Sequence, residues 1–281
     1  MTTTLPSLPA SRGEAETLLD RVVRENRFTI SVFFPLNGAV LLTASAMGWL
    51  PAWLSFNPAL VLFGTVVMRS PLLVGVTPLL NRRATAGVLG LAAYAYAVEY
   101  VGIQTGMPYG EFSYGVALGP TLSGVPVGLP VFFLPLVMNA YLLGLLLLGE
   151  RARSAPVRLG SVIGLVLVMD GVLDPGAVSL GFWSYAAGGP YYGVPLSNYA
   201  GWVLSATVAV VTMDRVFATA PLLARLRECE FMLDDMVSFV ILWGGINLWF
   251  GNAVPVALAA LVAVGLLRAD RFDASLLRLG E

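Results

Sequence analysis

Apolar residues fill most of the chain in long runs, separated by short polar segments or by loops rich in glycine and proline. A bilayer-spanning helix needs about 20 such residues. Eight runs qualify, although the fifth and the last two are short: approximately 28–50, 58–80, 84–103, 126–149, 157–173, 199–217, 236–250 and 252–267. The pattern predicts an all-α polytopic membrane protein with about eight transmembrane helices. Seven is the alternative, if 236–267 folds as one broken element.

The segment before the first run has a helical pattern of its own. Over residues 14–27, Leu18, Leu19, Val22 and Val23 share one face of a helix that is charged elsewhere, which is typical of a short helix at a membrane surface. The first residues of the chain, through Glu16, contain acids and no apolar core, unlike a cleavable signal peptide. We therefore expect a cytoplasmic N-terminal segment over 1–27, one transmembrane domain over 28–267 and a cytoplasmic tail over 268–281.

Arginine marks one side of the predicted membrane domain. All sixteen cations are arginines, and all but Arg69 lie before the first predicted span or at the boundaries that follow the second, fourth, sixth and eighth. The loops 104–125 and 174–198 contain none. Since cytoplasmic loops carry an excess of arginine and lysine, we expect a multi-pass protein of the cell membrane with both termini cytoplasmic and these two loops outside.

The amino-acid composition limits the kinds of catalytic and binding site that the chain can form. The net charge of −1 leaves no basic surface for nucleic acid. The chain has no histidine, and its lone cysteine, Cys229, excludes an intramolecular disulfide or a cysteine cluster. No metal or cofactor is expected. Acid–base chemistry then depends on carboxyl groups, with tyrosine as the main other candidate.

The two outer loops share a pattern that predicts a duplicated unit of helix, aromatic loop and helix. Glu99 stands fourteen residues before Ser113, and Asp170 stands fourteen before Ser184. The alternative is that similar turn residues merely punctuate two membrane loops. The matching elements are Ser113-Tyr114 with Ser184-Tyr185, Gly119-Pro120 with Gly189-Pro190, and Gly124-Val125-Pro126 with Gly193-Val194-Pro195.

Three acids near these loops are candidate catalytic residues: Glu99, Asp170 and Asp174. An ionisable group at membrane depth costs roughly 2.5–3.5 kcal/mol, so such groups are functional candidates by default. Each also has a structural alternative. Glu99 could pair or extend to the surface, Asp170 could be a satisfied structural carboxyl, and Asp174 opens an Asp-Pro-Gly turn, where aspartate is ordinary turn chemistry.

Other polar and aromatic side chains are candidates for substrate binding. Arg69 is the only cation deep inside a span, away from its ends, and it needs an anionic partner, for which an outer-half carboxylate is within reach. Asn139 would lie near a cavity between the two repeats, or join helices by hydrogen bonds. The aromatic candidates could line a cation pocket or form an interfacial belt: Tyr114, Trp183, Tyr185, Tyr191, Tyr192 and Trp202.

This set of groups suits the addition of water to an alkene. A buried carboxyl can stay protonated and give its proton to a double bond, a second carboxylate can accept a proton, and aromatic rings can stabilise the cation between the two steps. We expect Asp170 to act as the acid and Glu99 as its repeat-related partner or the base. Asp174 would position the water.

Three segments carry a resemblance to a known family: EYVGIQTGMPYGEFSYG, DGVLDPGAVSLGFWSY and PYYGVPLSNYAGW. They resemble the carotenoid hydratases of the CruF type, and the resemblance extends from about Asn26 to Phe272. It implies hydration of the terminal double bonds of an acyclic fifty-carbon carotenoid. It also carries over Glu99, Asp170, Asp174, Trp183 and Tyr185 as site positions without assigning their roles. Membrane lipid and other carotenoid-pathway enzymes are the further partners considered.

Other functions remain open at this point. The spacing of Asp170 and Asp174 is like that of prenyltransferase motifs that bind Mg²⁺ and a diphosphate, although Asp234 and Asp235 fall on the predicted opposite face. A carotenoid cyclase begins with the same protonation. A transporter could also use repeats and buried acids.

Overall fold

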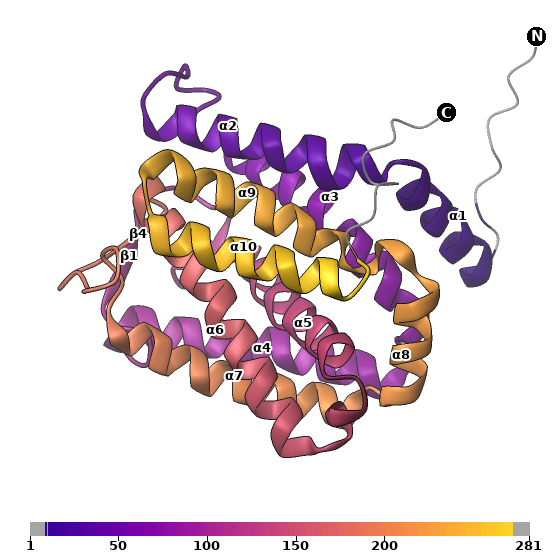
Figure 1. The fold of residues 1–281 in the computed structure, drawn as a ribbon. Coiled ribbons are helices and arrows are strands. Elements are labelled where there is room, and N and C mark those ends of the chain that lie inside the picture. The colour runs from indigo at the N-terminus through magenta and orange to yellow at the C-terminus, as the bar shows by residue number, and fades with distance from the viewer. Residues whose placement is uncertain (1–8, 10, 272–281) are drawn as a thin grey trace, which may run out of the picture.

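The computed structural model describes residues 9 and 11–271, and helices dominate it (Figure 1). The tail predicted over 268–281 lies mostly outside the described residues. The α-helices are α1 (Arg12–Glu25), α2 (Phe34–Ala46), α3 (Pro58–Val76), α4 (Arg82–Thr105), α5 (Leu129–Leu148), α6 (Ala155–Leu180), α7 (Leu196–Val216), α8 (Thr219–Glu228), α9 (Asp234–Phe250) and α10 (Ala253–Arg268). The short strands are β1 (Phe112–Tyr114), β2 (Thr121–Leu122), β3 (Val125–Pro126) and β4 (Trp183–Tyr185).

Seven helical segments of the described chain are long and apolar enough to cross a membrane, which confirms the predicted polytopic helical fold. They are Thr29–Ala46, Pro58–Leu79, Arg82–Thr105, Leu129–Arg153, Ala155–Leu180, Leu196–Val216 and Glu230–Phe250. The eighth predicted span is α10, a separate apolar helix of 16 residues. At 1.5 Å per residue it is about 24 Å long, shorter than the hydrocarbon core of about 30 Å.

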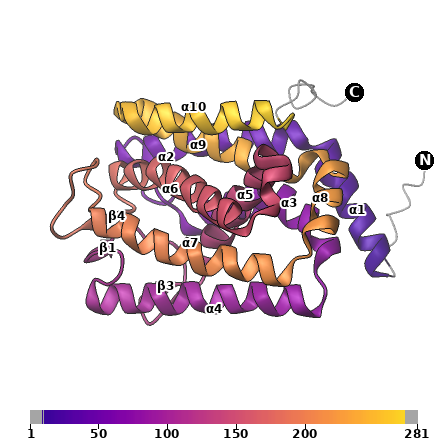
Figure 2. The ribbon, with the colours of Figure 1, turned by 60° about the horizontal axis from the view of Figure 1, so that its bottom comes forward.

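Helix α6 lies at the centre of the bundle. It packs against α5, α7, α9 and α10. In Figure 1, α2, α9 and α10 lie on one side of α5 and α6, and α4 and α7 lie on the other; Figure 2 shows the same order from α10 to α4. The interior position of α6 buries two of its carboxyl side chains, Asp170 and Asp174.

The expected turn at Asp174-Pro175-Gly176 is wrong, because α6 continues through it to Leu180. Proline removes the N–H that would bond the carbonyl four residues earlier. That carbonyl belongs to Gly171, and it accepts a hydrogen bond from the Tyr191 hydroxyl at 3.0 Å instead. The next carbonyl, of Val172, accepts one from Asn247 of α9 at 2.8 Å. Neighbouring side chains therefore allow the helix to tolerate its proline.

Strands β1 and β4 join the two repeated loops. They pair antiparallel, with Ser113 opposite Ser184. Gly115 makes the close approach possible, because a Cβ there would lie 2.3 Å from the carbonyl oxygen of Gly181. Ser113 and Ser184 hold equivalent positions in the two repeats. An approximate two-fold axis that relates the α4–β1–α5 unit to the α6–β4–α7 unit requires such residues to face each other across an antiparallel pair. Both views place this pair at the end of the bundle opposite α1 and α8 (Figures 1 and 2).

Candidate active site

The two repeated loops close over a pocket inside the helical bundle. Its empty space, counted with the open mouth, is about 980 Å³, of which about 140 Å³ can hold the centre of a water molecule. The lining is mostly apolar and aromatic. It comes from both loops and from α4, α5, α6, α7 and α9, and it includes Tyr109, Phe112, Phe133, Phe182, Trp202 and Trp243.

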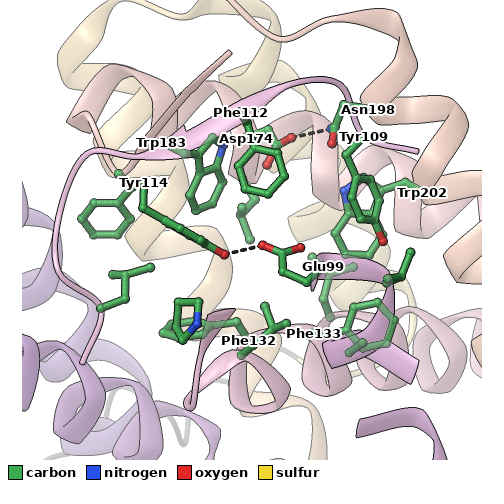
Figure 3. A pocket seen from close by; sticks show the side chains of 18 of the residues that line it. Glu99, Tyr109, Phe112, Tyr114, Phe132, Phe133, Asp174, Trp183, Asn198 and Trp202 are labelled. Atoms are coloured by element: carbon green, nitrogen blue, oxygen red, sulfur yellow. Dashed lines mark hydrogen bonds between the residues drawn. The ribbon is translucent and has the colours of Figure 1, made fainter. Parts of the chain in front are cut away.

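Glu99 of α4 projects into this pocket (Figure 3). Its carboxyl group accepts a hydrogen bond from the hydroxyl of Tyr114 on β1. Burial, followed by the charge of Glu99, raises the pKa of the Tyr114 hydroxyl well above its ordinary value. The phenol therefore keeps its proton at physiological pH and acts as a donor to Glu99.

Asp174 of α6 lines the same pocket from the second repeat. Its Oδ2 atom accepts hydrogen bonds from the Tyr185 hydroxyl of β4 at 3.2 Å and from the Asn198 amide of α7. Burial, followed by the charges of Asp174 and Asp170, raises the pKa of Tyr185. Each repeat thus places a protonated tyrosine of its own strand against one of its own carboxyl groups.

Asp170 lies one helical turn before Asp174, on the same face of α6. It is fully buried, does not line the pocket, and accepts a hydrogen bond from the same Asn198 amide nitrogen at 3.1 Å. Two carboxyl groups therefore share one amide donor. In a site of low dielectric, two neighbouring carboxyls do not both ionise readily.

Glu99, Asp170 and Asp174 differ from the other buried acids in their partners. No arginine of the described chain forms an ion pair with any of the three. By contrast, Asp234 pairs with Arg27 at 2.7 Å, and Asp235 pairs with Arg69 at 2.6 Å. An arginine favours the ionised form of its carboxylate partner more strongly than neutral tyrosine and amide donors do.

The structure corrects the position expected for Arg69. Its partner is Asp235, near the start of α9, and not a carboxyl group of the aromatic end. Asn139 donates to the other oxygen of Asp235 at 2.6 Å. Neither Arg69 nor Asn139 lines the pocket. Asn139 lies three residues beyond Leu136, the deepest pocket residue on α5, or about 4.5 Å along the helix.

Among the aromatic candidates, Tyr114, Trp183, Tyr185 and Trp202 line the pocket. Tyr191 and Tyr192 do not. They pack edge to face at 5.0 Å between ring centroids, and the Tyr192 hydroxyl accepts a hydrogen bond from the Val254 amide at 3.2 Å.

Several lining residues were not among the sequence candidates, notably Asn198, Phe133 and Trp243. Asn198 had one usable signal: it is an amide at the start of an apolar run, four residues before Trp202 on the same helical face. Phe133 and Trp243 reach the pocket from α5 and α9, and no local pattern distinguishes them from other core aromatics.

Comparisons with known proteins agree with the resemblance found in the loops. The sequence model of the carotenoid biosynthesis protein family matches residues 56–266. Over 268 residues the chain is 60% identical to the bisanhydrobacterioruberin hydratase of Haloarcula japonica, covering 95% of this chain and 91% of that protein. No solved structure matches the chain. The chain therefore belongs to the carotenoid biosynthesis protein family.

Proposed function

We propose that this protein is a carotenoid hydratase that adds water to the terminal double bonds of bisanhydrobacterioruberin, an acyclic fifty-carbon carotenoid, to give bacterioruberin. The relative's name supports the substrate. The observation that carries the chemistry is that Glu99 and Asp174 line one apolar, aromatic pocket while no arginine of the described chain pairs with either.

The reaction needs one acid and one base. The acid gives a proton to the CH carbon of the terminal (CH₃)₂C=CH group, which leaves a cation on the tertiary carbon. The oxygen of a water molecule bonds to that carbon, and the base takes the released proton. One alkene and one water thus become one tertiary alcohol, and the protein regains the proton it gave.

The geometry changes the roles assigned from the sequence. Asp170 does not reach the pocket, so it cannot hand a proton directly to the substrate. We assign the proton to the Asp170–Asp174 pair, which shares the Asn198 amide, and its delivery to Asp174. Glu99, held by Tyr114 in the same pocket, accepts the proton of the attacking water.

The aromatic lining stabilises the intermediate. Rings of Trp183, Tyr114 and Trp202 lie around the space between the two carboxyl groups (Figure 3), and Tyr185 also lines the pocket. A cation over an aromatic face gains about 0.5–2 kcal/mol per ring, more where water is excluded. An apolar wall also suits the hydrocarbon end of the substrate.

The same proposal includes a place in the cell membrane. Since the arginine-rich loops belong to the cytoplasmic side, both termini are cytoplasmic and the aromatic loops face outward. Membrane lipid surrounds the helices and supplies the carotenoid, and other enzymes of the pathway are candidate partners. The pocket takes one end of the carotenoid at a time.

The test is pigment analysis of a host that makes the anhydro precursor and carries this chain, grown in water enriched in ¹⁸O. We expect a product with two more hydroxyl groups than the precursor, each of the two added groups carrying ¹⁸O. Glu99→Gln and Asp174→Asn should each lower hydration at least about 100-fold, as loss of a general acid or base does. Glu111→Gln, at an exposed loop carboxyl, is the matched control.

Other results would contradict the proposal. Wild-type hydration in both carboxyl variants would remove them from the chemistry. A ring-closed product without ¹⁸O would indicate a cyclase. Activity that depends on Mg²⁺ and a diphosphate substrate would indicate a prenyltransferase.

A further inference from the structure

Asp170 has a second carboxyl oxygen that the site described above does not use. Asp170 is fully buried, and its Oδ1 atom has no hydrogen-bond partner among the described residues. Leaving a buried polar atom unsatisfied costs about 1–3 kcal/mol, more for a charged group. Most such atoms are therefore bonded to protein or to an ordered water.

Tyr199 presents a second unpartnered group close to the first. It follows Asn198 on α7, and its hydroxyl is buried without a partner among the described residues. The amide of Asn198, the residue before it, donates to Asp170 at 3.1 Å, and Asp170 and Tyr199 form no direct hydrogen bond with each other. Two buried polar atoms that lack a direct partner can both be satisfied by one bridging water.

This region is separate from the hydrocarbon pocket. Neither Asp170 nor Tyr199 lines the pocket, whereas Asp174 does. On the outer side of this region, the ring of Tyr191 packs against the ring of Tyr199, with 5.8 Å between the two centroids. The half-buried Tyr191 belongs to the outer loop, and its hydroxyl bonds the carbonyl of Gly171, the residue after Asp170. The region therefore lies between the carboxyl pair and the loop surface.

We propose that a buried water bridges Asp170 Oδ1 and the Tyr199 hydroxyl, and that it returns protons to the Asp170–Asp174 pair during turnover. The proposal rests on the proposed hydratase function. Each hydration removes one proton from the pair and leaves one on Glu99, which releases it to solvent through the pocket mouth after the product leaves. While a carotenoid end fills the pocket, the bridging water gives a proton to Asp170 from the side away from the pocket. The water then takes a proton from solvent through the outer loop. Tyr199 is a positioning residue, because it acts through this water.

Tyr199→Phe tests the idea, because it removes the hydroxyl and keeps the ring. We expect kcat to fall about tenfold, the effect of one lost hydrogen bond, with KM for the carotenoid unchanged. The ratio of kcat in H₂O to kcat in D₂O should rise, because proton return becomes limiting. Tyr100→Phe, at a half-exposed tyrosine of α4, is the matched control and should change neither quantity.

A wild-type kcat and isotope ratio in Tyr199→Phe would overturn the inference, and so would a change in KM alone, which would place Tyr199 in contact with the substrate. If wild-type protein adds no ¹⁸O to the carotenoid, the proposed function fails instead.

An infrared measurement on wild-type protein does not depend on how the Tyr199 variant folds. The carboxylic-acid band that is lost in Asp170→Asn should shift in D₂O even with substrate bound. A band that shifts only in substrate-free protein would place the water on the pocket side and contradict the inference.

Discussion

At the scale of single residues, the partner of each buried acid separates structure from chemistry. Asp234 and Asp235 form ion pairs with arginines. Glu99 and Asp174 face tyrosines. The sequence identified the three candidate acids by their depth in apolar runs. It did not identify the partner of Arg69, because Arg69 and Asp235 are 166 residues apart and only the packed fold brings them together.

The two tyrosine donors can be tested as a matched pair. Tyr114→Phe and Tyr185→Phe each remove one hydrogen bond to a site carboxyl, and a bond of this kind contributes about 1.5–3 kcal/mol. We expect each to lower kcat for hydration by about 10- to 100-fold. The pKa of both hydroxyls is raised, so neither phenol loses its proton up to about pH 9. The loss should therefore be the same from about pH 6 to about pH 9, measured by product formation in membranes.

The half-exposed Tyr100, changed to phenylalanine, is again the control for loss of a phenol on α4. A loss in Tyr114→Phe that appears only above pH 9 would mean that the hydroxyl acts as a base, contrary to the donor role.

At the scale of elements, helix α6 shows why hydropathy alone could not place its end. Asp-Pro-Gly is a strong local turn signal, and the predicted span stopped at residue 173. The helix continues because Tyr191, in the following loop, bonds the carbonyl that Pro175 leaves free. This compensation depends on tertiary contact, which a local pattern cannot reveal. Only by continuing does α6 bring Asp174 to the pocket.

This account predicts an energetic coupling between Pro175 and Tyr191. Pro175→Ala restores an N–H that can bond the Gly171 carbonyl within the helix. Tyr191→Phe should therefore destabilise the wild-type protein by about 0.5–1.5 kcal/mol and the Pro175→Ala protein by much less. Thermal unfolding of the four proteins in detergent measures the coupling.

Tyr96→Phe supplies the control, because the Tyr96 hydroxyl also bonds a carbonyl, that of Pro126, at 3.0 Å, away from Pro175. Its effect should be the same in both backgrounds. Equal costs of Tyr191→Phe with and without Pro175 would show that the freed carbonyl does not depend on Tyr191.

At the scale of the whole molecule, most of the architecture was predictable and the composition of the pocket was not. Long apolar runs predict helices because a backbone in lipid must satisfy its own hydrogen bonds, and seven of the predicted spans are long apolar helices. The repeated loop motif placed Ser113 and Ser184 in equivalent positions, and these residues face each other across β1 and β4. Phe133 and Trp243 reach the pocket from helices outside the loop motif, so their place depends on packing.

Buried acids that pair with arginine lie toward one end of the bundle, and the pocket carboxyls, which have no arginine partner among the described residues, lie toward the other. The Arg69–Asp235 pair tests this division. Asp235 lies eight residues, or about 12 Å along α9, from the pocket residue Trp243. Removing one member of a buried ion pair costs about 3–5 kcal/mol, whereas removing both charges can be nearly neutral. We expect Arg69→Met to destabilise the protein strongly. Adding Asp235→Asn should recover most of that loss, since the new amide can still accept the hydrogen bond of Asn139.

Thermal unfolding in detergent, with hydration measured per folded molecule, checks both parts of this expectation. Asp235→Asn alone is the control, because it leaves the Arg69 charge uncompensated and should also destabilise. A double variant that recovers stability but not hydration would return Arg69 to a role in substrate binding. Recovery of both would show that charge balance at the arginine-rich end stabilises the bundle while the chemistry depends on the unpaired carboxyls at the other.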